Sequence, residues 1–359
     1  MSVQNQKEII EQVRKAYRAN NLTLYLGAGV SMGNGLPSWD KLVLAMYFSA
    51  IKRDDIVEGI RPFPNYLFAI AEWHLERRKE PLDITARKIR NLYADETLFL
   101  DKLHETLYAG FEVQNTRTIK TPNVASLRNA NPTLRAVADL CKKRSSSRAR
   151  VNSVISYNYD NLLELAIKDA KVQPIWRADQ RLKRGGLPVY HVHGFIPIEG
   201  TRSTLDEVVF TEEQYYLAAQ NAYSWSNLTQ IKHLSNSVGL MIGLSVTDRN
   251  MRRLLDALKK TPLTPENYVI LQKPQWPAPD KNCDLKRIDE KAKLYSDRFR
   301  KSGRKTDEKK YTQIEEIIAG VEESDFHEQQ VLLEKLGVYP IWYTNHAEVP
   351  AIIKSIANA

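Results

Sequence analysis

The chain has 359 residues, of which 43% are hydrophobic and 26% charged, and a formal net charge of +9. These proportions are typical of a globular protein with a sizeable core, built as two domains or as one α/β domain with insertions. The N-terminus opens on polar residues without a signal peptide, and no apolar run approaches the roughly 18 residues of a membrane helix. Only Cys141 and Cys283 are present, which excludes a disulfide framework and a four-cysteine zinc site. We therefore expect a cytoplasmic protein that does not enter a membrane.

Two basic segments, residues 142–150 and 286–310, carry part of the positive charge. Either segment could contact the phosphates of a nucleic acid. Acidic residues punctuate the second segment, which favours a charged surface helix there. The first segment is equally compatible with a solvated linker.

Hydrophobic periodicity predicts the elements of the first part of the chain. A helix is expected over residues 4–19, a buried strand over 22–26, a helix after Pro37 and another helix over 134–140. Ser38 or Asp40 could cap the helix after Pro37. Residues 63–110 show helical patterns without a clear strand, so we expect residues 61–130 to form a helical insertion or small domain.

Strands and helices alternate in the second part. Strands are expected over residues 151–156, 189–194, 238–242, 268–271 and 339–343, with helices beginning near Asn161, Glu213 and Asn250. Apolar strands separated by helices are typical of a parallel sheet covered by helices on both faces, the Rossmann-like arrangement of α/β proteins. Residues 1–60 and 131–359 would form this domain. A polar, charged excursion over about residues 273–330 would carry one or two helices.

A glycine turn, Gly27-Ala28-Gly29-Val30-Ser31, follows the first predicted strand. Its glycines would let the backbone turn tightly and approach a ligand, and its amides could bind a pyrophosphate beside a helix N-terminus. The third glycine of the dinucleotide-binding pattern falls on Met32, with Gly33 one place late. Taken alone, the turn therefore scarcely distinguishes a nucleotide site from an ordinary strand-to-helix connection.

Polar breaks follow four of the predicted strands. They are Gly27–Ser31, Asn158–Asp160, His193–Gly194 and Gly243–Ser245. Because ligands of open parallel sheets bind outside the carboxyl ends of the strands, these breaks are expected to converge on one site.

Asn158, Asp160 and His193 are the candidates for chemistry at this site. Asn158 offers an amide to a sugar hydroxyl or a water, Asp160 offers an acceptor, and His193 can act as a general base near neutral pH. Each also has an ordinary alternative: Asn158 and Asp160 could cap the helix beginning near Asn161, and His193 could be a hydrogen-bonded strand-end histidine. His191 competes with His193, since strand alternation would place both on one face.

Four blocks, in this order, resemble the sirtuin-like NAD-binding family. They are Gly27–Ser31 with Gly35-Leu36-Pro37, Tyr157–Asp160 as the Asn-x-Asp block, His193-Gly194, and Gly243-Leu244-Ser245 followed by Asp248-Arg249-Asn250. The resemblance implies that Asn158 and His193 are the catalytic pair and that Asp160 supports them. It also implies that NAD⁺ is bound by Gly27, Ala28, Gly29, Ser31, Pro37, Gly243, Ser245 and Asp248.

The chain departs from the deacylating branch of that family in two places. Pro37 is followed by Ser38-Trp39 instead of Asp-Phe-Arg, and residues 195–242, where deacylases usually insert a four-cysteine zinc module, contain no cysteine. The Pro-Ser-Trp, Asn-Tyr-Asp and Ser-x-x-Asp-x-Asn blocks look like the bacterial anti-phage branch. That resemblance implies a zinc-free enzyme that hydrolyses NAD⁺ to nicotinamide and ADP-ribose, so that NAD⁺ depletion stops the infected cell.

Two other functions fit parts of the sequence. The same Asn and His would serve an NAD-dependent protein deacylase, and the basic charge would suit a nuclease or scaffold subunit of a DNA-associated complex, although no acidic metal cluster is assignable to a nuclease. Members of the anti-phage branch are usually fused to, or encoded beside, a sensor or a DNA-translocating ATPase of the HerA-like type. The resemblance therefore implies a homo-oligomer with such a partner, and the basic segments add DNA as an expected contact.

Overall fold

A computed structural model describes most of the chain. The described residues are 3–51, 72–73, 75, 77, 79–93, 95–110, 123–142, 151–167, 172–261, 265–275, 287–288 and 308–357. Most of both basic segments lies outside these ranges, as do parts of the predicted helical insertion and of the predicted polar excursion. None of the described helices is both long and apolar enough to cross a membrane.

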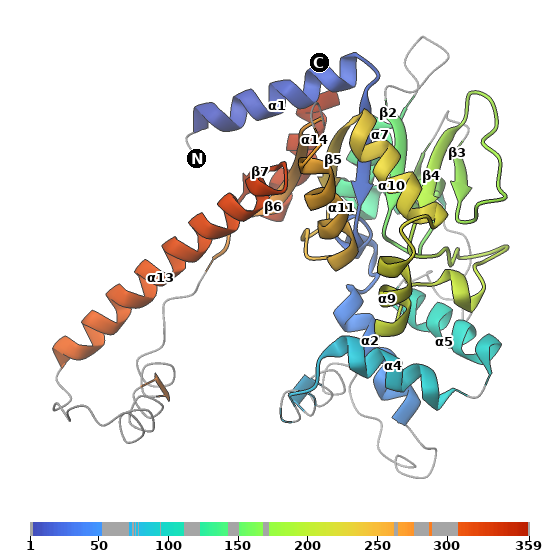
Figure 1. Ribbon diagram of the computed structural model, residues 1–359, viewed down its shortest axis with the longest axis horizontal. Helices are drawn as coiled ribbons and strands as arrows, with labels where there is room; N and C mark the ends of the chain where they lie inside the picture. Colours follow the sequence, from blue (N-terminus) through green and yellow to red (C-terminus); the bar gives the residue numbers. More distant parts are fainter. Residues whose placement is uncertain are drawn as a thin grey trace.

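The described residues contain one sheet of seven parallel strands (Figure 1). The strands are β1 (Leu22–Leu26), β2 (Val151–Ser156), β3 (Val172–Ile175), β4 (Leu187–His191), β5 (Val238–Ile242), β6 (Asn267–Gln272) and β7 (Val338–Tyr343). Their order is β3-β4-β2-β1-β5-β6-β7. The predicted α/β fold with a Rossmann-like parallel sheet is confirmed.

Strand β1 lies at the centre of the sheet, between β2 and β5. All five of its residues are buried, and Leu24 pairs with Val154 on one side and with Leu240 on the other. The strand order reverses at β1: β2, β4 and β3 lie on one side of it, and β5, β6 and β7 lie on the other. In sheets of this kind the crevice at the reversal, beyond the carboxyl ends of the strands, is where ligands bind.

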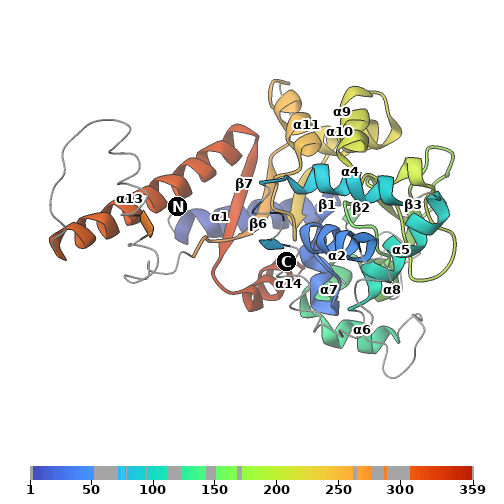
Figure 2. The same cartoon turned by 90° about the horizontal axis from the view of Figure 1, so that it is seen from below.

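Helices cover both faces of the sheet, and Figure 2 shows the sheet between the two layers. One face packs against α1 (Val3–Arg18), α7 (Pro132–Leu140), α8 (Leu162–Ala166) and α14 (Val349–Ala357). The other face packs against α10 (Trp225–Asn236) and α11 (Arg249–Lys259). Alternation along β1 explains both contacts, since Leu24 belongs to the first core cluster and Tyr25 to the second.

A group of helices lies beyond the carboxyl edge of the sheet, at the bottom of Figure 1. It comprises α2 (Trp39–Ile51), α4 (Leu82–Leu92), α5 (Glu96–Tyr108) and α9 (Glu212–Gln220). Helix α4 packs against α2 and α9, while Ile89 and Phe99 join the same core cluster as Leu24. The helical character predicted for residues 63–110 is confirmed by α4 and α5, in the part that the structure describes. The boundaries of a separate insertion at residues 61–130 stay a prediction.

The ends of these helices follow from local side-chain chemistry. Ser38 precedes α2 and its hydroxyl accepts from the Lys41 amide at 3.4 Å, as one of the two predicted caps would. Asn123 and Asn131 cap α6 (Val124–Ala130) and α7, and Thr211 with Gln214 forms a capping box at α9. Short 3₁₀ turns connect other elements: η1 (Ala28–Val30), η2 (Met32–Asn34), η3 (Leu205–Glu207) and η4 (His346–Glu348).

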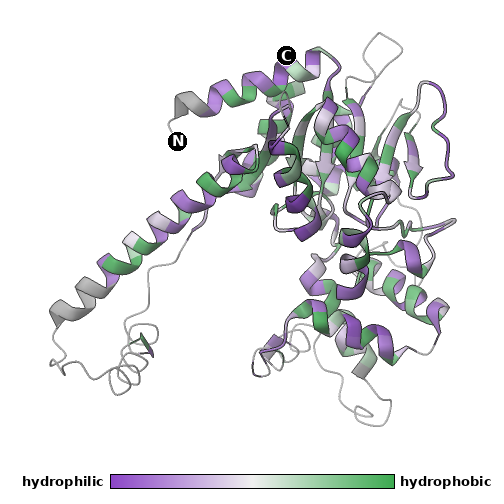
Figure 3. Cartoon of the chain, in the orientation of Figure 1, coloured by the Kyte–Doolittle hydropathy of each residue, from purple (hydrophilic) through white to green (hydrophobic). Residues whose placement is uncertain are grey.

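Helix α13 (Glu308–Lys335) extends away from the rest of the protein (Figures 1 and 2). Its C-terminal end packs against β7, whereas Ile317 and Val321, nearer to its N-terminus, are 65% and 62% exposed. Figure 3 shows hydrophilic and hydrophobic residues mixed along this length. The helix lies partly within the predicted polar excursion, for which helices without strands were expected.

The structure adds three elements that were not predicted and shortens one that was. Helix α14, which follows the last predicted strand, is one of the additions. The others are β3, a four-residue edge strand containing Pro174, and α10, which carries mostly polar residues, so neither of these two has a strong apolar period. Strand β4 ends at His191 instead of continuing to residue 194. The chain turns out of the sheet there, and Gly194 adopts a φ of +107° that favours glycine.

Candidate functional site

A pocket of about 1090 Å³ opens at the carboxyl ends of β1, β2 and β5. Every site residue predicted from the sequence lines it: Gly27, Ala28, Gly29, Ser31, Pro37, Asn158, Asp160, His193, Gly243, Ser245 and Asp248. These residues come from four separate stretches of the chain, which the parallel sheet brings to one edge. The predicted convergence of the polar breaks is therefore what the structure shows.

The loops after β1 and β5 contact each other at their glycines. A Cβ atom at Gly27 would lie 2.5 Å from the Gly243 oxygen, and one at Gly29 would lie 2.8 Å from the Gly243 Cα. Gly243 also has a φ of +67°, in the left-handed region. The close packing of the two loops thus requires these glycines, whether or not a ligand also approaches them.

Most amides of the glycine turn are already used within the protein. The amide groups of Gly27 and Gly29 donate to Ile242 and Gly243, and those of Val30 and Ser31 donate to Gly27 and Ala28. The whole turn was expected to bind a phosphate through its amides, but these four amides already have partners within the protein. The N-termini of α2 and α11 also line the pocket, and helix N-termini favour anions.

Replacing Gly243 by alanine is expected to destabilise the fold more than the same change at Gly185. Both glycines have positive φ, so alanine costs about 1–2 kcal/mol at either position. An added Cβ meets the Val30 nitrogen at 2.7 Å in Gly243→Ala but nothing within 4 Å in Gly185→Ala. We expect a further loss of about 1–3 kcal/mol for Gly243→Ala, measured by urea unfolding. Equal losses in the two variants would contradict the packing role.

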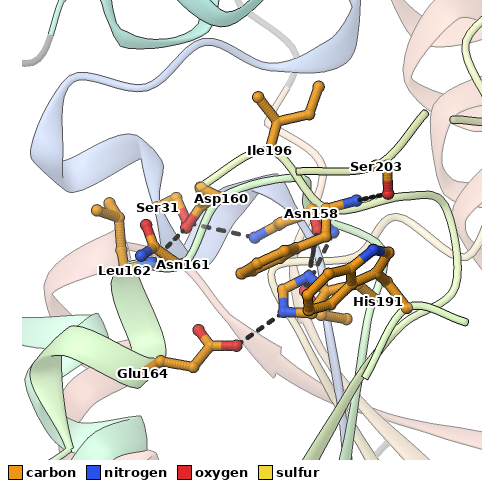
Figure 4. Close-up of polar contacts among 12 residues, drawn as sticks. Ser31, Asn158, Asp160, Asn161, Leu162, Glu164, His191, Ile196 and Ser203 are labelled. Carbon is orange, nitrogen blue, oxygen red and sulfur yellow. Dashed lines mark hydrogen bonds and ion pairs between the residues drawn. The ribbon is translucent and has the colours of Figure 1, made fainter. Parts of the chain in front are cut away.

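Asn158 lies in a hydrogen-bonded chain with the first loop (Figure 4). Its Nδ2 donates to the Gly27 oxygen at 3.0 Å and to the Ser31 hydroxyl at 3.2 Å. Ser31 in turn donates to Asp160 Oδ2 at 2.8 Å. Because the Gly27 carbonyl can only accept, the carboxamide nitrogen must face it. The Asn158 side-chain oxygen is therefore the atom left for a ligand, and it can accept from a hydroxyl or a water.

Asp160 is buried beneath this chain of bonds and has a second structural contact. Its Oδ1 accepts from the Leu162 amide at 3.0 Å, at the start of α8. Burial raises the pKa of the Asp160 carboxyl, and the bonds from Leu162 and Ser31 oppose that rise. The sequence allowed either Asn158 or Asp160 to cap the helix near Asn161, and Asp160 makes that contact. Asp160 also accepts from the Ser31 hydroxyl, which Asn158 contacts.

His193 follows the end of β4, and its ring faces the pocket. Tyr157 and Tyr215 meet the ring edge-on, with ring centroids 4.9 and 5.6 Å away. Its Nε2 lies 3.5 Å from Asp248 Oδ2. Burial lowers the pKa of His193, and the charge of Asp248 opposes this. The imidazole is therefore neutral near pH 7, as a general base must be.

His191 occupies a different environment from His193. Because β4 ends at His191, the two histidines do not share a strand face, and the prediction that they would is wrong. His191 is outside the pocket lining, and both of its ring nitrogens are hydrogen bonded, to the Asn158 carbonyl and to Glu164. Only His193 of this pair is placed to meet a ligand in the pocket.

Sequence reasoning assigned Asp248 to cofactor binding and gave no role to the tyrosines around His193. Asp248 Oδ1 caps α11 by accepting from the Met251 amide at 2.7 Å, while its other oxygen faces His193. Tyr157 precedes the Asn-x-Asp block, which offered a local signal. Tyr215 lies on α9, and no spacing in the sequence connects that helix to His193.

A family model, the SIR2-like domain, matches residues 152–295. The match supports a sirtuin-like family. It begins in β2 and includes Asn158, His193 and Gly243, whereas the Gly27–Pro37 stretch precedes it and reaches the same pocket through β1. No curated protein matches the chain.

The SIR2-like domain implies NAD⁺ binding and an NAD-dependent activity. The pocket is compatible with that ligand, since it is large and is lined by the glycines of two loops and by two helix N-termini. Among the residues that the structure describes, no group of three or more His, Cys, Asp or Glu side chains is arranged to hold a metal ion.

Proposed function

We propose that this sirtuin-like protein is an NAD⁺ glycohydrolase, which cleaves NAD⁺ to nicotinamide and ADP-ribose. The observation that carries the proposal is the meeting of Asn158 and His193 with the two glycine loops in one pocket, although these groups follow four different strands. An acceptor oxygen and a neutral imidazole are the groups that hydrolysis of a cationic glycosyl donor needs.

The reaction requires little covalent chemistry from the protein. The bond between nicotinamide nitrogen and ribose C1′ breaks, its electron pair neutralises the pyridinium, and the ribosyl group passes through an oxocarbenium-like state. Water attacks C1′ and forms the new C–O bond, while Asn158 Oδ1 accepts from a ribose hydroxyl or from that water. His193 takes the proton from that hydroxyl or water and releases it to solvent. The products are nicotinamide, ADP-ribose and one proton.

The composition of the segment after Gly194 favours hydrolysis over deacylation. Residues 195–242 contain no cysteine, so the ligands of a four-cysteine zinc module are not available there. Helix α9 instead contributes Tyr215 and Tyr216 to the pocket wall. A platform for an acyl-lysine peptide is not part of the proposed function, which requires only NAD⁺ and water.

The proposed role in the cell is that of an effector of anti-phage defence, acting by abortive infection through NAD⁺ depletion. This role would require a cytoplasmic location, and we propose with it self-association and a sensor or HerA-like DNA-translocating ATPase as partner. This part of the proposal is supported by the sequence blocks alone. Turnover of NAD⁺ measured with and without DNA, and at several salt concentrations, tests whether the basic segments contact phosphates.

A direct assay separates the proposed hydrolase from the alternatives. The purified chain is incubated with NAD⁺, and nicotinamide and ADP-ribose are quantified by chromatography. We expect equimolar products without any acyl peptide. Product formation that requires an acetylated peptide, with acyl transfer to ADP-ribose, would identify a deacylase. The absence of both reactions, together with salt-sensitive DNA binding, would favour the DNA-associated alternative.

Replacing Asp248 by asparagine is expected to shift the pH dependence of hydrolysis. Asp248 attracts the imidazolium form of His193, so its removal lowers the pKa of His193 further. The neutral base is lost as pH falls through that pKa; the acid limb of kcat/KM therefore moves to lower pH in Asp248→Asn. Asparagine also caps helices, so α11 keeps its start. An acid limb that stays fixed or moves upward would contradict the pairing.

A further inference from the structure

A buried pair of side chains, His191 and Glu164, lies behind Asn158 and outside the pocket lining (Figure 4). His191 is 1% exposed, and Glu164 belongs to α8. The His191 Nε2 is 2.7 Å from Glu164 Oε1, and the Nδ1 is 3.0 Å from the backbone oxygen of Asn158. The proposed reaction uses neither side chain, so the pair needs another explanation.

Hydrogen-bond chemistry fixes the number of protons on this pair. A backbone carbonyl only accepts, so the His191 Nδ1 carries a hydrogen and donates it to Asn158. The Nε2 and Glu164 Oε1 also need a proton between them; without one, a ring lone pair would face a buried carboxylate. The pair therefore shares one proton and is neutral overall.

The surroundings favour retention of that proton. The titratable groups around the pair are Asp160 after β2, Tyr108 of α5 and Cys141 after α7. Burial acts to lower the pKa of His191, but Glu164, the Asn158 carbonyl and Asp160 outweigh it, and the pKa is raised. Among the described residues, the second Glu164 oxygen is buried without a hydrogen-bond partner, which leaves His191 as the group that compensates this carboxyl.

We propose that the His191–Glu164 pair positions Asn158 for catalysis. Through Nδ1 it holds the Asn158 peptide, from which the carboxamide reaches Gly27 and Ser31. The carboxamide oxygen then keeps one orientation toward the pocket. The catalytic consequence rests on the proposed function, whereas the linkage from His191 to Asn158 does not.

Two substitutions at residue 191 separate the two hydrogen bonds. The side-chain amide of His191→Asn replaces Nδ1 and keeps the bond to Asn158, whereas that of His191→Gln replaces Nε2 and keeps only the bond to Glu164. We expect kcat for nicotinamide release to fall about 10- to 100-fold in His191→Gln and clearly less in His191→Asn. KM should change little in both, because the glycine loops are untouched.

Glu164 provides a second matched pair of variants. Glu164→Gln can donate to the ring nitrogen without a shared proton, so it is expected to keep the wild-type kcat. Glu164→Ala leaves the ring without its Nε2 partner and is expected to lower kcat. This comparison decides the question if His191→Gln does not fold, as judged by its thermal transition.

Nuclear magnetic resonance tests the linkage without any turnover. The ¹⁵N–¹H signals of the Asn158 carboxamide, identified by their loss in Asn158→Ala, should be preserved in His191→Asn and Glu164→Gln. They should move in His191→Gln and Glu164→Ala. If the wild-type chain releases no nicotinamide, the proposed function fails while these signals still test the linkage. Unmoved signals in His191→Gln and Glu164→Ala, or equal kcat in the two residue-191 variants, overturn the inference.

Discussion

Replacing His193 by alanine is expected to lower nicotinamide release about 10²- to 10⁴-fold, the usual contribution of a general base. Its ring is the neutral imidazole in the pocket, with Nε2 beside Asp248 and with tyrosines against its edges. Among the described residues, no hydrogen bond joins His193 to Gly27–Ser31 or to Gly243–Ser245, so NAD⁺ binding should be retained. Turnover is measured by chromatography, and binding by calorimetry.

The matched control for this variant is His327→Ala. His327 is an exposed histidine on α13 and does not line the pocket, so its replacement should leave turnover unchanged. His193→Gln restores a hydrogen-bonding side chain but not a base, so it should remain as inactive as His193→Ala. Full activity in either His193 variant would remove this residue from the catalytic set.

Replacing Asn158 by alanine is expected to have the second-largest effect, a loss of about 10²-fold in kcat, comparable to the removal of one transition-state hydrogen bond. The substitution removes the acceptor oxygen facing the ligand and the two bonds that Nδ2 makes to the first loop. The Asn158→Ala substitution therefore removes a hydrogen-bond acceptor for the substrate and at the same time releases Ser31 from one of its contacts. Steady-state kinetics over a range of NAD⁺ concentrations give kcat and KM separately.

Ser31→Ala distinguishes these two contributions of Asn158. It removes one of the loop contacts and leaves the carboxamide oxygen in place, so a smaller loss of kcat is expected. Asn236→Ala serves as the control, since Asn236 is an exposed asparagine bonded only within α10. A loss in Ser31→Ala equal to that in Asn158→Ala would assign the effect to loop position instead of to the acceptor oxygen.

The order of strands and helices could be predicted because the central strands are rich in apolar residues and are followed by polar or glycine-containing turns. Val238–Ile242 is such a strand, whereas β3 contains Pro174, borders only β4 and is half-exposed, so it has little apolar signal. The end of β4 was placed too late because Val192 is apolar and continues the run. The strand stops at His191 because the backbone turns there, and the positive φ of Gly194 and the 3.0 Å between an added Cβ at this residue and the Val208 Cα both belong to that turn.

The pocket could be predicted because parallel strands bring their carboxyl ends to one edge, whatever their separation in sequence. The interior of the site could not. Asn158 was assigned to catalysis, but its carboxamide and carbonyl also bond to Gly27, Ser31 and His191, which local sequence does not place beside it. The role of Tyr215 likewise depends on how α9 packs against the sheet edge.

The contact between the two glycine loops has a consequence for folding. Gly27 and Gly29 lie in the loop after β1, whereas Gly243 lies in the loop after β5, more than 200 residues later in the chain. The contact between the two loops therefore cannot form in a chain that has assembled only one half of its sheet, and bringing segments so far apart in sequence together is an entropically costly step. A ligand bound across the two loops would draw its affinity from the completed sheet and would stabilise both halves together.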